Sequence, residues 1–366
     1  MTSGGAENYN MTQVRKLDGN LIRFDFLTTR EGEHAYNDEI RRLGGGIFVI
    51  PPPKESGAMK YMRNAQRIMR EHGPYAAVHA HTFLNCGLNM LAAKMCGVKI
   101  RISHSHSAKD YQYAGLKQKL YNRSMRFMIK AFSTKYAACG VDAGINLFGK
   151  RFLDTKKGVL LHNAIDIDRF TGVTDSEKLS IREEFSAGPE VLLLVNIGRF
   201  AIQKNHEFSI KIAEQLKGTG INFKMLLLGQ GELTEKIKAM ASERGLADRV
   251  VFAGVRHDVP AVLAAADVFI LPSFFEGLPV AAIEAQATGL PCICSEHVTR
   301  ETDIGLSLVK FLPIGQGCEE AWARQCAEFA GYTRPTREAV RVALFGNGYK
   351  AETGVKTLTD IYTGRI

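Results

Sequence analysis

The feature that most constrains the fold is a strand, a tight loop and a helix that follow one another between residues 266 and 289. The apolar run at residues 266–271 has the length of a strand, Pro279 suits the first turn of a helix, and Gly289 suits its end. Open α/β sheets bind ligands beyond the carboxyl ends of their strands, and free N–H groups at a helix start favour phosphate or sugar oxygens. The pattern therefore predicts a ligand site on an α/β sheet.

Two glutamates occur within this unit. Glu276 lies in the loop, and Glu284 follows about one turn inside the helix. Taken alone, two such residues would be read as solvated surface acids. Gly277, directly after the first, allows the backbone to come close to a ligand. We therefore expect both carboxylates to face one pocket at the end of the strand.

This stretch resembles the E-x7-E signature of the retaining glycosyltransferases of family four, which have the GT-B fold and include many exopolysaccharide and capsule enzymes. The two glutamates match at Glu276 and Glu284, and the motif E-G-x-P is intact through Gly277, Leu278 and Pro279. In that family the first glutamate and the following amides hold hydroxyls of the donor sugar, and the second glutamate holds the ribose. The resemblance implies the same roles here.

A cationic motif precedes this stretch in the chain. The apolar run at residues 191–197 reads as a buried parallel strand, and Arg199 and Lys204 follow it. In the family, this G-R-x4-K pattern supplies the cations that neutralise the nucleotide diphosphate. Arg256 follows another predicted strand, where the family contacts the nucleotide base, largely through backbone groups. Asn205 is expected to cap the next helix.

The first half of the chain alternates strand-like and helical segments, which predicts a parallel, doubly wound sheet. Gly4 and Gly5 match the family's G-G-A-E loop, but the apolar strand that precedes this loop in the family is missing here. We expect that the natural protein starts upstream of Met1. An incomplete or degenerate gene product is the alternative. The strands are expected at residues 21–28, 47–50, 76–79, 98–103, 134–139 and 158–162.

The chain of 366 residues is long enough for two domains with full cores. We expect residues 1–170 to form an N-terminal, acceptor-side Rossmann-like domain. Residues 171–345 would form a C-terminal, nucleotide-sugar-binding Rossmann-like domain, entered by a polar linker at 171–189. Residues 346–366 would end a helix that spans 336–363 and crosses back onto the first domain. The resemblance implies a GT-B enzyme with its active site in the cleft between the domains.

Four histidines follow two of the predicted strands, as the pairs His79 and His81, and His104 and His106. Two His-x-His pairs suggest zinc. No acidic or cysteine ligand accompanies them, and the family needs no bound metal, so we predict neither a metal nor another cofactor. The family usually carries one histidine here that reaches the donor sugar. His106 is the better match and His104 the fallback. His81 is a candidate for the same cleft, and His79 for packing within the strand.

Residues 116–132 predict a basic amphipathic helix, in which Leu116, Leu120 and Phe127 recur at helical spacing among lysines and arginines. Related enzymes use such a helix to sit on the membrane that carries their lipid-linked acceptors. A core-facing helix with a solvated basic back is the alternative.

Charge and cysteine content indicate which partners and which cellular compartment suit the protein. The net charge is +9, and residues 1–165 alone hold 25 Lys/Arg against 12 Asp/Glu. A basic half of this kind suits nucleic acid, an anionic membrane, a diphosphate-linked acceptor, or merely a soluble basic face. The resemblance implies that no nucleic acid is bound. Seven cysteines, scattered and mostly within apolar segments, indicate reduced thiols, so we expect a cytoplasmic protein at the inner face of the membrane.

The resemblance implies a retaining glycosyltransferase that moves a sugar from a nucleotide donor, expected to be UDP-linked, to a glycan or a polyprenyl-diphosphate-linked acceptor in bacterial surface polysaccharide biosynthesis. Glu276, His106, Arg199 and Lys204 are its expected catalytic residues. Two other classes remain open. One is a GT-B nucleotide-sugar epimerase, and the other is a non-enzymatic basic protein that binds membrane or nucleic acid.

Overall fold

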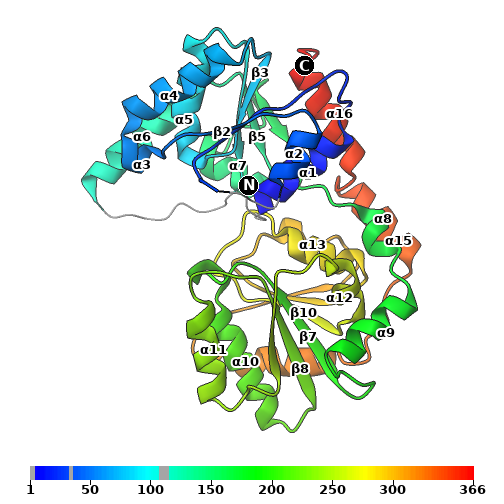
Figure 1. Ribbon diagram of the computed structural model, residues 1–366. Coiled ribbons are helices and arrows are strands. Elements are labelled where there is room, and N and C mark those ends of the chain that lie inside the picture. Colours follow the sequence, from blue (N-terminus) through cyan, green and yellow to red (C-terminus); the bar gives the residue numbers. More distant parts are fainter. Residues whose placement is uncertain (1–4, 33–35, 107–114) are drawn as a thin grey trace. The chain divides into compact units, whose positions relative to one another are not determined.

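The computed structural model describes residues 5–32, 36–106 and 115–366 and divides into two compact units (Figure 1). The N-terminal unit comprises the chain up to Ala164 together with Ala351–Ile366, and the C-terminal unit comprises Ile165–Lys350. The last segment of the chain is therefore grouped with the first. No helix among the described residues is both long and apolar enough to span a bilayer.

The N-terminal unit contains two separate parallel sheets. One pairs β1 (Phe26–Thr28) with β2 (Ile47–Val49). The other has four strands in the order β3, β4, β5, β6, and all of its strands are parallel. The predicted α/β character of this half is confirmed, and the expectation of an upstream strand stays a prediction. The bounds of the four strands are Ala77–Ala80, Ile100–Ser105, Lys135–Ala138 and Gly158–Leu160.

Helices cover both faces of the four-stranded sheet (Figure 1). On one face, Tyr9 of α1 (Gly5–Lys16) and Leu358 of α16 (Ala351–Tyr362) pack with Ile102 of β4. Helices α5, α6 and α7 cover the other face, around a core that includes Met90 and Ile129. The other helices of this unit are, in chain order, α2 (Asn37–Arg42), α3 (Pro53–Ser56), α4 (Ala58–Glu71), α5 (Cys86–Met95), α6 (Leu116–Phe132) and α7 (Val141–Phe148).

The C-terminal unit is built on a six-stranded parallel sheet in the order β12, β11, β10, β7, β8, β9. Because β7 lies inside the sheet and the chain winds outward on both sides of it, the strand order reverses between β7 and β10. Such a switch point is where doubly wound sheets bind ligands. The strands span Leu192–Ile197 (β7), Phe223–Leu228 (β8), Val250–Gly254 (β9), Val268–Leu271 (β10), Cys292–Ser295 (β11) and Val309–Leu312 (β12).

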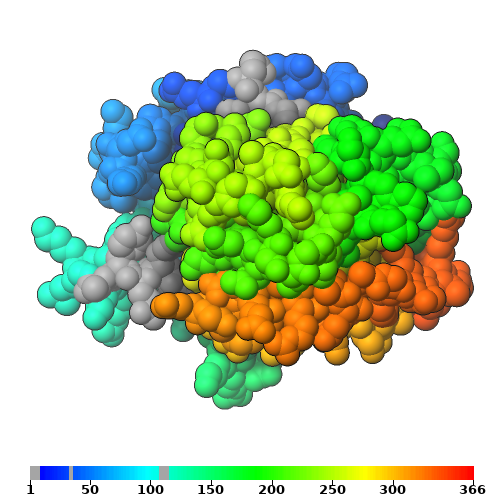
Figure 2. All heavy atoms as spheres, turned by 90° about the horizontal axis from the view of Figure 1, so that it is seen from below, coloured from blue at the N-terminus to red at the C-terminus, as the bar shows by residue number. Residues whose placement is uncertain are grey.

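Helices again cover both faces of this sheet. Helices α10, α11 and α14 pack over one face, with Trp322 of α14 fully buried against Phe208 of α10. In Figure 2 the orange surface, from the part of the chain that contains α14, adjoins the green surface, from the part that contains α10. Helices α12 and α13 lie on the opposite face (Figure 1). Their bounds are His206–Gly218 (α10), Thr234–Glu243 (α11), Val259–Ala265 (α12), Val280–Ala287 (α13) and Glu319–Glu328 (α14).

Three expectations about elements were wrong. The linker predicted at 171–189 contains a helix, α9 (Asp175–Glu184), which follows the short α8 (Ile167–Thr171). The helix predicted at 336–363 is two helices, α15 (Arg337–Gly346) and α16, interrupted where Gly348 adopts a left-handed φ of 78°. The strand predicted at 21–28 is reduced to β1, because Leu21 is 55% exposed and lies in a turn.

Candidate active site

The loops after β7 and β10 bring a predicted cation and a predicted acid together. Lys204 ends the short 3-10 helix η2 (Ile202–Lys204) after β7, and Glu276 lies between β10 and α13. The Nζ atom of Lys204 is 2.7 Å from Oε1 of Glu276, and these side chains are only 19% and 8% exposed. The strand pairing of β7 with β10 is what places these loops side by side.

Gln203 also holds Glu276, and sequence reasoning missed it. Its Nε2 atom donates to the carbonyl oxygen of Phe275 at 2.9 Å and to Oε2 of Glu276 at 3.3 Å. The backbone N–H of Phe274 donates in turn to the carbonyl oxygen of Gln203. Each carboxylate oxygen of Glu276 therefore has its own donor. The available signal was only that Gln203 directly precedes the lysine of the G-R-x4-K pattern.

Arg199 lies on the surface, in contrast to Lys204. Its guanidinium is 63% exposed and pairs with Glu232 at 3.4 Å. The G-x-G motif after β8 supports this loop, since a Cβ at Gly231 would lie 2.4 Å from the carbonyl oxygen of Phe200. Only glycine permits that approach. Arg199 is thus held on a rigid loop with its charge open to a solvent-borne anion.

Glu284 lies in the second turn of α13 and is only partly exposed. Burial raises the pKa of its carboxyl to about 7, and the charge of Arg169 opposes this shift. An ionisable group with a strongly perturbed pKa, on the helix that follows a strand at the switch point of the sheet, is a candidate functional group.

The side chains of two other residues singled out from the sequence make contacts within the protein that the sequence did not predict. The Arg256 guanidinium donates to both Glu184, at 2.5 Å, and Asp258, at 2.5 Å, so only its backbone is open to a nucleotide base. Asn205 does not cap α10, because it has a left-handed φ of 53° and makes no capping hydrogen bond. Its Nδ2 atom donates instead to the carbonyl oxygen of Pro272 at 3.1 Å, which ties the loops after β7 and β10 together.

In the N-terminal unit the four histidines form one cluster. Nδ1 of His81 lies 2.8 Å from Nε2 of His106, and Nε2 of His79 lies 3.1 Å from Nδ1 of His104. Burial, together with the charge of neighbouring histidines for some of them, lowers the pKa of each ring, that of His106 to about 4. Gly5 begins α1, whereas Gly4 lies outside the described residues.

Comparison with known proteins places the chain in a family. Residues 3–169 match the family model Glycosyltransferase Family 4, and residues 177–304 match Glycosyl transferases group 1. The putative glycosyltransferase EpsF of Bacillus subtilis (strain 168) is 37% identical over 99% of this chain and 94% of its own length. The capsular polysaccharide biosynthesis glycosyltransferase CapH of Staphylococcus aureus is 27% identical over 78% of this chain and 76% of its own length.

Solved structures agree on the fold. HepE of Anabaena, in complex with UDP and glucose, superposes with a TM-score of 0.76 at 15% identity, covering 99% of this chain and 96% of that one. WaaG, a glycosyltransferase of lipopolysaccharide biosynthesis, superposes with a TM-score of 0.74 at 18% identity, covering 99% and 96%. Together with the family matches, these findings show that the chain belongs to the family-four glycosyltransferases and has their GT-B fold.

Proposed function

We propose that this glycosyltransferase transfers a sugar, with retention at the anomeric carbon, from a UDP-linked donor to a glycan or polyprenyl-diphosphate-linked acceptor in bacterial surface polysaccharide synthesis. The contact of Lys204 with Glu276 at the switch point of the C-terminal sheet carries this proposal. Support for these substrates comes from a related protein of Escherichia coli, which is 26% identical over 65% of this chain. Its name is UDP-Gal:alpha-D-GlcNAc-diphosphoundecaprenol alpha-1,3-galactosyltransferase.

Stabilisation of the departing diphosphate is the main chemical demand of the reaction. Arg199 offers a planar, exposed fork for phosphate oxygens, and Lys204 a compact charge in a largely buried position. The free N–H groups at the start of α13 add a third positive element. A preorganised set of this kind stabilises developing negative charge electrostatically. We propose that the diphosphate needs no metal ion.

The acids position the other parts of the donor. Glu276 accepts hydrogen bonds from hydroxyls of the transferred sugar, next to the backbone of Gly277, Leu278 and Pro279. Glu284 accepts from the ribose hydroxyls, and the base lies against the backbone at Arg256. The roles predicted for His106, Gly4 and Gly5, which belong to the N-terminal half of the chain, stay predictions. No protein nucleophile is assigned, and the departing phosphate accepts the proton of the acceptor hydroxyl.

The Lys204–Glu276 pair implies an exchange of partners when the donor binds. Without donor, the two side chains neutralise each other at 2.7 Å. With donor, Lys204 gains phosphate oxygens and Glu276 gains sugar hydroxyls, so each charge keeps a partner throughout. This arrangement avoids leaving a buried charge unpaired in the free enzyme, which would cost several kcal/mol.

Helix α6 supplies a surface suited to a membrane. Leu116, Leu120 and Phe127 are 82%, 68% and 68% exposed, and helical geometry places them within about 40° of one another around the axis. Exposed Arg123 and Lys130 flank this stripe, while Met125 and Ile129 on the opposite side are buried. We propose that this stripe contacts the inner face of the membrane that carries the acceptor.

The test of the donor site is the substitution Lys204→Ala. Removing the buried cation should lower the rate of sugar transfer roughly 100- to 1,000-fold, the size expected for loss of one electrostatic contact to a developing charge. Transfer is measured as product formed from labelled UDP-sugars on lipid-linked acceptors, and the anomeric configuration of the product is read by NMR.

The matched control is Lys236→Ala, which removes the lysine of another Lys–Glu pair of the same unit, 63% and 42% exposed. Its transfer rate should equal that of the parent protein. Equal rates in the parent and the Lys204→Ala protein would refute the diphosphate assignment, and an inverted product would refute retention.

A further inference from the structure

Four histidines share one face of the N-terminal sheet at the ends of β3 and β4. Residues two apart on a strand point to the same face, which groups His79 with His81 and His104 with His106. The parallel register that pairs Ala80 with Ser103 sets the two pairs side by side. The ring centroids of His81 and His106 are 5.1 Å apart, and those of His104 and His106 are 4.1 Å apart.

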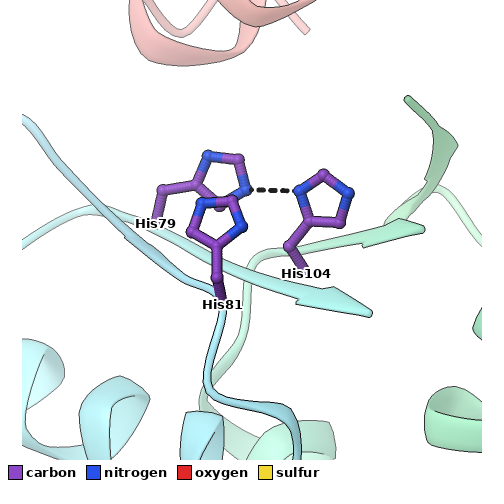
Figure 3. A group of neighbouring side chains, drawn as sticks. All are labelled: His79, His81 and His104. Carbon is purple, nitrogen blue, oxygen red and sulfur yellow. Dashed lines mark hydrogen bonds between the residues drawn. The ribbon is translucent and has the colours of Figure 1, made fainter. Parts of the chain in front are cut away.

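Three of these rings converge with the spacing of a metal site (Figure 3). One ring nitrogen from each of His79, His81 and His104 lies within 4.8 Å of the other two. Nε2 of His79 and Nδ1 of His104 are 3.1 Å apart. In a tetrahedral zinc site with Zn–N bonds of about 2.0–2.1 Å, ligating nitrogens are about 3.3–3.4 Å apart. The distance between these two nitrogens is therefore already close to the distance between two ligands of one zinc ion.

In two of these rings, the nitrogen that would not bind the metal has a hydrogen-bonding partner, as is usual for histidine ligands. Nδ1 of His79 lies 2.6 Å from the hydroxyl of Tyr362, and Nδ1 of His81 lies 2.8 Å from Nε2 of His106. A ligating histidine nearly always donates its second N–H to an outer partner, which sets its tautomer and ring orientation.

The same cluster of rings contains buried polar atoms without partners. Among the residues that the structure describes, Nε2 of His104, Nδ1 of His106 and the hydroxyl of Tyr9 are buried and have no hydrogen-bond partner. His104 is fully buried and Tyr9 is 3% exposed, and their ring centroids lie 5.2 Å apart. Each such atom costs about 1–3 kcal/mol. The protein alone therefore leaves several buried polar groups of this cluster unsatisfied, as binding sites often do.

We propose that His79, His81 and His104 bind one divalent first-row transition metal ion, with zinc the best fit. Imidazole ligands suit zinc, cobalt, nickel and copper, whereas a set without carboxylates does not suit magnesium or calcium. This departs from the prediction of no metal, which rested on the lack of acidic or cysteine ligands and on the family's lack of need for a bound metal. Three histidines with an open fourth position are a known zinc arrangement.

The ion has a structural consequence. It joins the ends of β3 and β4 and, through the Tyr362 hydroxyl, links them to α16. It also fixes His81, whose ring orients His106. The diphosphate chemistry proposed above assigns no role to this ion, and the cations that it uses are Arg199 and Lys204.

The experiment uses the untagged full chain, stripped with a chelator and equilibrated with zinc. Metal analysis after dialysis should find about one ion per chain, and zinc should raise the melting temperature as any ligand of the folded state does. His81→Gln should abolish both effects. The matched control is His72→Gln, an exposed histidine of the same unit, which should bind zinc as the parent does.

Two further variants and a spectrum keep the outcome clear. Tyr362→Phe removes only the outer partner of His79 and should weaken zinc binding by roughly 10- to 100-fold. Cobalt in place of zinc should show the intense visible bands of a tetrahedral site in the parent and not in His81→Gln. A parent protein that binds no zinc, or equal zinc binding by His81→Gln and His72→Gln, would overturn the proposal.

Discussion

At the scale of single residues, the predicted donor site combines a largely buried Lys–Glu pair with a mostly exposed arginine, which pairs with Glu232. Lys204 and Glu276 satisfy each other in a largely buried position, and Arg199 remains exposed. Glu284 differs from both, because its surroundings disfavour its charge and raise its pKa to about 7. A carboxylate whose charge destabilises the free protein is more typical of binding sites than of structural ones.

Glu284→Gln should therefore stabilise the protein in a pH-dependent way. The ordinary pKa of a glutamate is 4.5, so the penalty for ionising Glu284 in the folded state is absent at pH 4 and complete above pH 7. The substitution should raise the melting temperature at pH 8 and leave it nearly unchanged at pH 4. Each kcal/mol of relieved penalty corresponds to about 2–4 °C.

The same substitution should weaken donor binding at pH 8, since the ribose hydroxyls lose an anionic acceptor. Glu243→Gln, on the exposed side of α11, is the control and should change neither property. A melting temperature shifted equally at pH 4 and pH 8, or unchanged donor affinity, would contradict the role of Glu284.

Residue-level prediction from the sequence depended on whether a contact is local. Arg199, Lys204, Glu276 and Glu284 could be named because each belongs to a motif contained in one loop and helix. The hold of Gln203 on Glu276 requires β7 and β10 to be neighbours, which no local pattern reveals. The same holds for His79 and Tyr362, which are 283 residues apart in the chain.

At the scale of elements, buried parallel strands were predicted well because they are continuous apolar runs, as in β7 and β10. Helix α9 was missed, although Thr174 and Glu177 form a capping box at its start. The surrounding stretch is polar, and this suggested a linker. The break between α15 and α16 depends on the left-handed conformation of Gly348, and glycine within a helical pattern is an ambiguous signal.

Helix α6 carries the element-scale prediction. Replacing Leu120 and Phe127 together by glutamate should weaken binding to anionic lipid vesicles about 100-fold or more, because two side chains lose their burial in lipid. Binding of the parent should also fall as salt rises, since the flanking cations act through screened charge. Vesicle co-sedimentation measures both effects.

The control is the double variant Leu179→Glu and Val342→Glu, which makes the same charge change at side chains that are 60% and 61% exposed on α9 and α15. Its vesicle binding should match that of the parent, apart from the general effect of net charge. Equal loss in the two double variants would show that charge alone, and not the stripe on α6, governs binding.

At the scale of the whole molecule, alternating strands and helices were enough to predict two Rossmann-like halves. The cations and acids predicted for the donor site all lie in the C-terminal unit, and the division of donor and acceptor tasks between the units stays a prediction. The histidine cluster could be listed from the sequence but not assembled, because its spacing depends on the register of β3 and β4 and on helices from both ends of the chain.

The central claim is that Arg199 and Lys204 bind the diphosphate of a nucleotide donor, and comparing UDP with uridine tests it most directly. Affinities of both ligands are measured by titration calorimetry, or by NMR where binding is weak, for the parent and for Lys204→Ala. The account predicts that the substitution weakens UDP binding roughly 10- to 100-fold, the 1.5–3 kcal/mol of a charge-assisted contact, and leaves uridine binding unchanged. Equal losses for both ligands, or no loss for UDP, would contradict it.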